Sequence, residues 1–381
     1  MKLVDLPVKG KIVLVRVDFN VPMDAKGNIL DDTRIRASLP TIQYLLDQDA
    51  SVILMSHLGR PKGKKDPKLS LAPCAERLSQ LLGQKVEMSE LKTGGVLLLE
   101  NLRFDPAEEA PESNPSFAAN LAKLGDFFVN DAFATAHRVH SSTITIAEHF
   151  VGKSAPGFLM QKEIDFLGKY FEEPPRPFYA IIGGAKVSSK LGVLKSLLEK
   201  VDALFIGGGM AYTFLKVQGK EIGDSLVENE LLQTAKEFLE LAEKKKIPVF
   251  LPKDFIAADA FSNDATRKIV LSDAGIPPGF QGLDIGPITR TEWANTFSNA
   301  QMIFWNGPLG VFEFSQFAEG THCIATALAD LDAITIVGGG DSIAAINQLK
   351  IAEQFTHIST GGGACIEYIQ HGSLPGIDAL K

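Results

Sequence analysis

Short apolar runs alternate with amphipathic stretches along the whole chain of 381 residues. Continuous apolar runs of this kind are typical of strands that are buried on both faces of a parallel sheet. In the second half of the chain five such runs, 178–182, 203–206, 302–305, 334–337 and 357–360, lead directly into glycine or Asn-Gly. Glycine at the end of a strand allows a ligand close to the backbone and offers it N–H groups. The pattern predicts a sheet edge shaped for a phosphate-bearing molecule.

The first half repeats this rhythm with a different edge. Apolar runs at 12–15, 52–55, 96–99 and 127–129 lead into segments that carry arginine, histidine and asparagine. An arginine fork matches the oxygens of a carboxylate or a phosphate two at a time. The two halves are therefore predicted to hold two different ligands, with a small, highly charged anion in the first.

Amphipathic segments with apolar residues at three- and four-residue spacing predict the helices between the runs. Their expected ranges are 33–46, 72–82, 118–124, 190–199, 229–245, 293–297, 317–329 and 342–349. A further helix, 158–171, lies between the breakers Pro156–Gly157 and Pro174–Pro175, as either a rigid spacer or a hinge element. The alternation predicts an α/β fold with two doubly wound, Rossmann-like parallel-sheet domains joined by a connecting helix.

Composition narrows the classes of protein. With 45% hydrophobic and 22% charged residues the chain has the composition of an ordinary globular protein, and its net charge of −8 argues against nucleic acid as the main partner. No apolar run approaches the roughly 20 residues that span a bilayer, and no apolar signal region follows Lys2. Three scattered cysteines, Cys74, Cys323 and Cys365, argue against a disulfide framework. We therefore expect a cytoplasmic protein.

Standard nucleotide motifs are absent. The P-loop pattern GxxxxGK[ST] occurs nowhere, and GxGxxG fails because its last glycine would fall on Tyr212 or on Ile343. The HRD and DFG signatures of protein kinases are also missing. The second half is thus predicted to bind phosphate without a P-loop or a dehydrogenase-type motif.

Several residues beyond the strand ends are candidates for that chemistry. The segment Gly338–Ser342 could hold a phosphate chain with Asp341 on a Mg²⁺ ion, or it could be a strand–helix turn in which Asp341 or Ser342 caps the helix. Lys186 and Lys190, at the start of the same predicted helix, would stack on one face, where they either face an anion or are ordinary surface lysines. Arg34 could bind an anion or form an ion pair with Asp31–Asp32.

Taken together, the segments closely resemble the phosphoglycerate kinase family. The matching motifs, in sequence order, are RVDFNVP from Arg16, DTRIR from Asp32, SHLGRP from Ser56, ENLRF from Glu100, NDAFATAHR from Asn130, GGAKV from Gly183, GGGM from Gly207, WNGP from Trp305, GGGDS from Gly338 and STGGG from Ser359. No single motif establishes the resemblance. The number of matching motifs and their order along the chain establish it. Ser342 replaces the threonine usual in the family and keeps its hydroxyl.

The resemblance implies reversible transfer of the acyl phosphate of 1,3-bisphosphoglycerate to MgADP, which gives 3-phosphoglycerate and MgATP in glycolysis and gluconeogenesis. It implies an N-terminal phosphoglycerate-binding domain, 1–157 plus about 365–381, because the closing segment of the family returns to that domain. The linker with the connecting helix would be 158–175, and the nucleotide-binding domain 176–364. A monomer with small-molecule substrates is expected.

The resemblance also implies the roles of individual residues. The glycerate compound would be bound by Asp18, Phe19, Asn20, Arg34, His57, Leu58, Gly59, Arg60, Arg103 and Arg138. The nucleotide would be bound by Gly184, Lys190, Gly208, Gly209, Asn306, Glu313, Gly339, Gly340, Asp341 and Ser342, with Asp341 on Mg²⁺ and Glu313 on the ribose. Arg34 and Lys186 would stabilise charge on the moving phosphoryl group.

Elementary chemistry agrees with these roles. Phosphoryl transfer depends on positioning and on positive charge around the equatorial oxygens, and an acyl phosphate has a good leaving group, so no general base is required. Closure of two domains over the substrates would exclude water. Two rival interpretations are a nicotinamide-dependent dehydrogenase, which lacks its GxGxxG here, and a non-catalytic two-domain binding protein, which leaves the glycine-terminated strands without a purpose.

Overall fold

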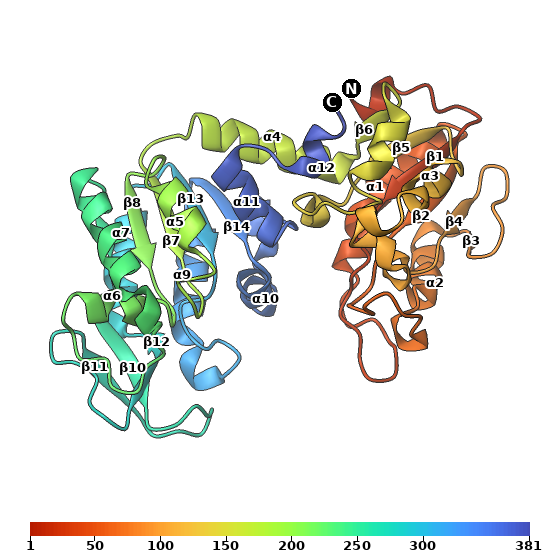
Figure 1. The fold of residues 1–381 in the computed structure, drawn as a ribbon. Helices are drawn as coiled ribbons and strands as arrows, with labels where there is room; N and C mark the ends of the chain where they lie inside the picture. Colours follow the sequence, from red (N-terminus) through yellow and green to blue (C-terminus); the bar gives the residue numbers. More distant parts are fainter. The chain divides into compact units, whose positions relative to one another are not determined.

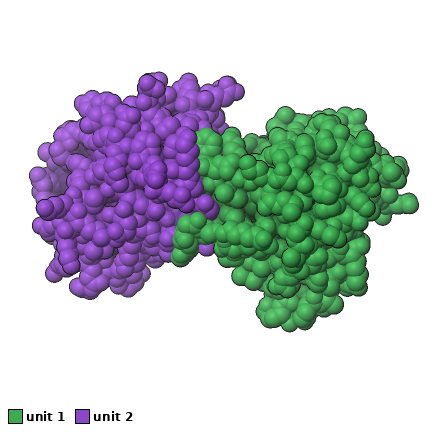
Figure 2. Space-filling model, turned by 90° about the horizontal axis from the view of Figure 1, so that it is seen from above, with its two compact units in different colours: residues 1–167, 371–381 green, residues 168–370 purple.

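The computed structural model describes residues 1–381 and contains two compact units (Figure 1). Unit 1 comprises residues 1–167 and 371–381, and unit 2 comprises residues 168–370 (Figure 2). Helix α4, Phe158–Glu172, contains the boundary at Leu167–Gly168. Residues 365–370, which we expected in the first domain, belong to helix α11, Gly363–His371, and to unit 2. The division into two domains and a separate linker stays a prediction.

Unit 1 is built on six parallel strands in the order β3-β4-β2-β1-β5-β6. The strands are β1 (Ile12–Arg16), β2 (Ser51–Met55), β3 (Val86–Glu87), β4 (Val96–Leu98), β5 (Phe127–Asn130) and β6 (Ser154–Pro156). The central strands are buried along almost their whole length, as their continuous apolar runs predicted.

Helices cover this sheet and supply the rest of the core. They are α1 (Thr33–Asp47), α2 (Ala72–Leu82), α3 (Ser116–Ala122) and the C-terminal α12 (Pro375–Asp378). Ile35, Ile42 and Leu45 of α1 recur at helical spacing and pack with Val13 and Val15 of β1 in one apolar cluster. The chain end belongs to this unit, where Gly376 N–H donates to Ala136 O (2.7 Å).

Unit 2 contains a second parallel sheet in the order β15-β14-β13-β7-β8-β9. The strands are β7 (Phe178–Ile182), β8 (Ala203–Ile206), β9 (Val249–Phe250), β13 (Met302–Asn306), β14 (Ile334–Gly338) and β15 (His357–Ile358). The last strand is shorter than the predicted run 357–360. Ser359 N–H still donates to Val337 O of β14 (2.8 Å), but Ser359 Oγ accepts a hydrogen bond from Gly361 N–H (3.2 Å) in the loop that follows.

The helices of unit 2 are α5 (Leu191–Leu197), α6 (Ala211–Val217), α7 (Leu232–Lys244), α8 (Pro287–Phe297), α9 (Glu319–Ala329), α10 (Gly340–Leu349) and α11. Trp293 of α8, Ile324 of α9 and Ile346 of α10 share one apolar cluster with the sheet. On the other face of the sheet, Phe171 of α4 packs edge-on against Phe178 of β7 and Phe304 of β13. Both faces are thus covered, and the predicted α/β class with two doubly wound sheets is confirmed.

A three-stranded antiparallel sheet in unit 2 was not predicted. It consists of β10 (Asp254–Ala258), β11 (Arg267–Leu271) and β12 (Gln281–Ile285), in the order β11-β10-β12. Its edge strand β11 exposes most of its residues, and glycine and proline interrupt the surrounding segments. Strand β10 does contain a continuous apolar run, the buried Phe255–Ala258, but half of it is alanine, which has low strand propensity.

Strand order creates one switch point in each sheet. In unit 2 the chain leaves β7 toward β8 and leaves β13 toward β14, although β7 and β13 are neighbours. In unit 1 the neighbours β1 and β5 likewise lead in opposite directions, to β2 and to β6. Ligands of doubly wound sheets bind at the carboxyl ends of such strand pairs, because the diverging connections leave a crevice there.

The N-terminus of α4 is held by a buried carboxylate. Asp131, which follows β5 and is 1% exposed, accepts hydrogen bonds at Oδ1 from the N–H groups of Leu159 (3.0 Å) and Met160 (3.2 Å). A Cβ on Gly157 would lie 2.2 Å from the same oxygen, so only glycine fits the entry to the helix. Burial raises the pKa of Asp131 from 3.8 to about 6, against these hydrogen bonds.

This shift predicts a pH-dependent contribution to stability. Because the folded-state pKa is raised, the contribution is fully present below the unfolded value of 3.8 and is lost as the pH rises through about 6. The shift corresponds to about 3 kcal/mol. We expect Asp131→Asn, which keeps an acceptor oxygen, to abolish this decline in urea unfolding curves measured from pH 4 to pH 7. Parallel curves for both proteins would contradict the assignment.

Candidate active site

In unit 1 the candidate residues gather at the carboxyl edge of the sheet. Because the strands are parallel, the segments after β1, β2, β4 and β5 leave from the same edge, and they carry residues 17–20, 56–60, 99–103 and 131–138. Asp131 N–H donates to Arg16 O (2.8 Å) directly at the β1–β5 switch point. Tertiary structure thus brings together four segments that are far apart in the chain.

Arg34 forms an ion pair with Asp18. The alternative partners from the sequence are wrong for Arg34, because Asp32 is paired with Arg36 (2.9 Å) and Arg77 (2.8 Å) instead. Asp18 also accepts a hydrogen bond from Asn20 N–H (3.1 Å). Asn20 Oδ1 in turn accepts from Gly59 N–H (2.9 Å), which ties the loop after β1 to the loop after β2.

Arg103 is almost fully buried and retains donors without hydrogen-bond partners. Its Nη1 donates to Gly59 O (2.8 Å), and Nε lies 3.1 Å from Glu109 Oε1 in an ion pair without hydrogen-bond geometry. Its Nη2 has no hydrogen-bond partner at all. Burial lowers the pKa of Arg103, and Glu109 opposes that shift. Buried donors of this kind have lost their hydrogen bonds to water without gaining a partner in the protein. They therefore indicate a binding site for an anion.

The remaining candidates of unit 1 line the same edge at different depths. Arg138 is half-buried, with Nε donating to His137 Nε2 (3.2 Å), whereas Arg60 is exposed. Phe19 and Leu58 are buried, and their N–H groups donate to Ser56 Oγ (2.8 Å) and Asn101 Oδ1 (3.2 Å). The backbone N–H groups of these two residues are therefore already hydrogen-bonded within the protein.

Three buried residues of this region are absent from the sequence-based candidates. They are Arg16, Glu108 and His140. Arg16 contacts His57, which is itself 3% exposed, and Glu108 lies next to Arg16 and His140. Arg16 and His140 belong to segments whose charged residues did stand out, but Glu108 lies in an acidic stretch without any signal. His140 lies 3.8 Å from Glu108, yet burial and then Arg16 lower its pKa to about 3, so the contact is not an ion pair near neutral pH.

In unit 2 the glycines allow three loops to touch. A Cβ on Gly183 would lie 2.1 Å from Pro308 O, and one on Gly208, whose φ is +65°, would lie 2.7 Å from Gly184 N. The expectation that strand-end N–H groups are free for a ligand is wrong at Gly183 and Gly184. They donate to Asn306 O (2.9 Å) and Pro308 O (2.9 Å), because the loops satisfy each other at the β7–β13 switch point.

Free N–H groups occur at α10 instead. Its own hydrogen bonds begin with Ile343 N–H donating to Gly339 O (3.1 Å), which leaves the N–H groups of Gly340, Asp341 and Ser342 in the first turn. Gly339, with φ +91°, is the N-cap residue, so the alternative in which Asp341 or Ser342 caps the helix is wrong. The buried hydroxyl of Ser342 accepts a hydrogen bond from Gly307 N–H (2.7 Å).

The two candidate lysines are not stacked on one helix. Helix α5 begins at Leu191 and Lys190 is its N-cap. Residues 187–190 close a turn of their own (Lys190 N–H to Val187 O, 2.9 Å), and Lys186 lies just before that turn. Lys190 Nζ donates to Asn306 Oδ1 (2.5 Å), and burial lowers the pKa of Lys190 against the attraction of Asp341. Asn306 Nδ2 is buried without a hydrogen-bond partner.

A pocket of about 390 Å³ adjoins these loops. Gly184, Gly208 and Gly209 line it together with the exposed Glu313 and Asp341. One wall comes from the antiparallel sheet, through Gln281, Gly282 and Leu283, which the sequence did not predict. Lys190, Asn306, Gly339, Gly340 and Ser342 are not among its lining residues, so the candidates of unit 2 divide into a pocket and a helix terminus that meet at Asp341.

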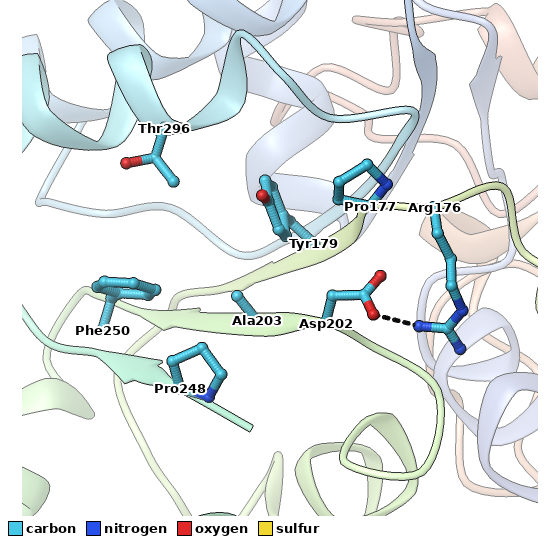
Figure 3. Close-up of a pocket in the computed structure, with 8 residues that line it drawn as sticks. All are labelled: Arg176, Pro177, Tyr179, Asp202, Ala203, Pro248, Phe250 and Thr296. Atoms are coloured by element: carbon cyan, nitrogen blue, oxygen red, sulfur yellow. Dashed lines mark hydrogen bonds and ion pairs between the residues drawn. The ribbon is translucent and has the colours of Figure 1, made fainter. Parts of the chain in front are cut away.

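A second hollow of about 460 Å³ lies at the opposite, amino edge of the same sheet (Figure 3). Its polar groups are already engaged: Arg176 donates to Asp202 Oδ1 (2.5 Å) and to Lys200 O (3.1 Å), and Asp202 Oδ2 accepts from Phe178 N–H (2.7 Å). This arrangement anchors the start of β7. Because ligands of doubly wound sheets bind at the carboxyl edge, we regard this hollow as structural.

Comparison with known proteins agrees with the fold. The family model described as phosphoglycerate kinase matches residues 3–372. Curated phosphoglycerate kinases from Moorella thermoacetica and Chloroflexus aggregans are 51% and 52% identical, over 100% and 99% of this chain and 98% of each relative. No helix is both long and apolar enough to cross a membrane.

Solved structures give the same result. Phosphoglycerate kinase from Coxiella burnetii has a TM-score of 0.90 at 42% identity, over 100% of this chain and 98% of that one. The enzyme from Pyrococcus horikoshii has a TM-score of 0.86 at 34% identity, with the same coverage. The chain therefore belongs to the phosphoglycerate kinase family, and it is a phosphotransferase of glycolysis that uses ADP and ATP.

Proposed function

We propose that unit 2 binds the nucleotide and unit 1 binds 3-phosphoglycerate or 1,3-bisphosphoglycerate. The observation that carries this assignment is the pocket of about 390 Å³, which joins the strand-end glycines to Glu313 and Asp341. Its walls combine bare backbone with apolar side chains such as Leu226 and Leu309, which suits a flat adenine ring. No arginine lines it, whereas Arg34, Arg60, Arg103 and Arg138 all belong to unit 1.

The nucleotide is proposed to run from the glycines toward α10. Gly184, Gly208 and Gly209 lie along the adenine, and the Glu313 carboxylate accepts hydrogen bonds from the ribose hydroxyls. The phosphates approach the first turn of α10, from Gly339 to Ser342, where free N–H groups and the helix dipole attract anions. Lys190 and Asn306 add a partly buried ammonium group and an unpartnered amide N–H₂ on the phosphate side.

A Mg²⁺ ion fits this arrangement through Asp341. Apart from the nucleotide, one carboxylate is enough, because Mg²⁺ on a nucleotide takes most of its ligands from phosphate oxygens and water. No group of three or more His, Cys, Asp or Glu side chains forms an all-protein metal site. When bound, the ion neutralises charge on the phosphates.

The glycerate ligand is proposed to lie at the carboxyl edge of the unit 1 sheet. Arg103 donates through its unpartnered Nη2, while Arg60 and Arg138 add charge from the exposed side. Asp18 and Asn20 accept from its hydroxyl group, and His57 donates to an oxygen. The buried Phe19 and Leu58, with Gly59, shape the floor.

Catalysis is proposed to rest on charge and positioning. Arg34 and Lys186 stabilise the equatorial oxygens of the phosphoryl group in flight, and no general base is needed because the acyl phosphate leaves readily. The two ligands bind to different units, so transfer requires a closed state in which they meet and water is excluded.

We also propose that the protein is a cytoplasmic monomer. Its N-terminal domain comprises residues 1–157 and is completed by the C-terminal segment, its linker is 158–175, and its nucleotide domain begins at residue 176. None of the three cysteines forms a disulfide, which supports a reducing compartment. Light scattering with size-exclusion chromatography tests the oligomeric state. A mass of two or more chains at micromolar concentration would reject the monomer.

Arg103→Ala tests the assignment of ligands to units. We expect KM for 3-phosphoglycerate to rise about 10- to 100-fold, because a hydrogen bond to a charged ligand is worth about 1.5–3 kcal/mol. KM for ATP should stay unchanged in a coupled assay. Arg36→Ala, which removes an exposed arginine paired with Asp32 in the same unit, is the matched control. A change confined to KM for ATP would reverse the assignment.

A further inference from the structure

Arg16 lies at the end of β1 and is completely buried. Its Nε donates to Ser142 Oγ (2.8 Å), its Nη1 donates to Val17 O, and its Nη2 contacts His57 Nδ1 (3.1 Å). A guanidinium group with no exposed surface and with a protein partner at each nitrogen cannot reach a ligand. Its positive charge therefore acts on its neighbours.

Glu108 provides the buried counter-charge. Its Oε1 lies 3.9 Å from Arg16 Nη2 and accepts a hydrogen bond from Ser142 Oγ (2.7 Å), while Oε2 accepts from Ser142 N–H (3.1 Å). Burial raises the pKa of Glu108, and Arg16 and Ser142 oppose that shift. Ser142 thus bonds to both members of the ion pair and holds Arg16 in one orientation.

This orientation determines where His57 carries its proton. An arginine can only donate, so the Nδ1 atom of His57 must present its lone pair, and the ring proton lies on Nε2. Burial, followed by Arg16, Arg103, His140 and Arg138, keeps the pKa of His57 well below 6.5. No protein acceptor takes a hydrogen bond from Nε2, so that N–H group is available to a ligand.

We propose that the Glu108–Arg16 pair fixes His57 as the neutral tautomer protonated at Nε2, which donates one uncharged hydrogen bond to the bound glycerate compound. His57 is the ligand-contacting group, and Arg16 and Glu108 are positioning residues that act through it. The identity of the ligand rests on the proposed function, but the tautomer does not. The proposed site already contains four arginines. The neutral His57 adds a directional hydrogen bond to the ligand without adding a charge that depends on pH.

The tautomer can be observed without substrate. In full-length enzyme labelled with ¹⁵N-histidine, and with His57 assigned by its absence in His57→Gln, we expect one protonated nitrogen, Nε2, and no titration from pH 5.5 to pH 8. Arg16→Lys keeps the charge but loses the fork, and it should produce a mixture of tautomers. Glu108→Gln provides a second test if Arg16→Lys does not fold. A proton on Nδ1, or titration of the wild type within this range, would overturn the proposal.

Kinetics test the donor role. The side-chain amide of His57→Gln can place a donor near the position of Nε2, so KM for 3-phosphoglycerate should stay within about fivefold of wild type, whereas His57→Phe should raise it about 10- to 100-fold. Equal impairment of both variants would overturn the donor role. If Arg103→Ala raises KM for 3-phosphoglycerate but His57→Phe does not, the proposed role of His57 is wrong and the assignment of the glycerate ligand to unit 1 stands. If neither variant raises KM for 3-phosphoglycerate, the proposed assignment of the glycerate ligand to unit 1 is wrong.

Discussion

Lys186→Ala is expected to lower kcat by about 10²- to 10³-fold while the affinity for ADP changes little. An electrostatic contact made mainly in the transition state typically contributes this much to the rate, because it stabilises charge that the ground state does not present in the same place. Single-turnover kinetics and ADP binding by calorimetry, measured on the same preparation, separate the two effects.

The structure indicates that this substitution removes the side chain without disturbing the backbone. Lys186 is exposed, and the turn that carries it is held by other groups: Ser188 Oγ donates to Glu228 Oε1 (2.5 Å), and Ser189 Oγ donates to Lys186 O (2.9 Å). Removal of the side chain therefore leaves the backbone anchored. Lys195→Ala, at an exposed position of α5, is the matched control and should leave both constants unchanged. Equal weakening of kcat and of ADP affinity would assign Lys186 to ground-state binding.

Gly183→Ala is expected to destabilise unit 2 by about 3 kcal/mol or more and to abolish most nucleotide binding. The new Cβ would lie 2.1 Å from Pro308 O and 2.6 Å from Gly307 O, and both are backbone atoms that cannot rotate away. The Asn306–Pro308 loop must then move, which also disturbs the contact of Gly307 N–H with Ser342. Urea unfolding and ADP titration measure the two consequences.

The control for this variant is Gly192→Ala in α5. There the new Cβ would meet the side-chain amide of Gln370, at the end of a flexible chain, so we expect a change within about 1 kcal/mol. If Gly183→Ala were as stable as Gly192→Ala and bound ADP normally, the close packing of the three loops would have no part in building the pocket.

Much of the fold could be predicted from local patterns. Helix α2 has the predicted bounds of 72–82, and the long buried strands of both sheets were predicted because their apolar runs are continuous. The antiparallel sheet was missed, since β11 is mostly exposed, glycine interrupts β12, and half of the apolar run of β10 is alanine, which has low strand propensity. Local composition signals a buried strand best where its apolar run is rich in β-branched or aromatic residues.

The candidate site was predicted less evenly. Residues at strand ends, such as Arg103 and Asn306, stood out because their position follows from the strand that precedes them. Glu108 and Gln281 did not stand out, since their neighbours in space come from distant segments. The pairing of Arg34 with Asp18 rather than with Asp31 or Asp32 also depends on how α1 packs beside β1.

The sequence by itself determined which segments are strands and helices, which strand ends carry glycine or arginine, and the family to which the chain belongs. Only the tertiary structure decided that β1 lies beside β5 and β7 beside β13, that Gly183 and Gly184 donate to a neighbouring loop, and that Arg16 contacts His57 rather than a ligand. Hydrophobic periodicity is a local property of the chain, whereas strand order, buried ion pairs and the direction of each N–H group depend on which distant segments pack together.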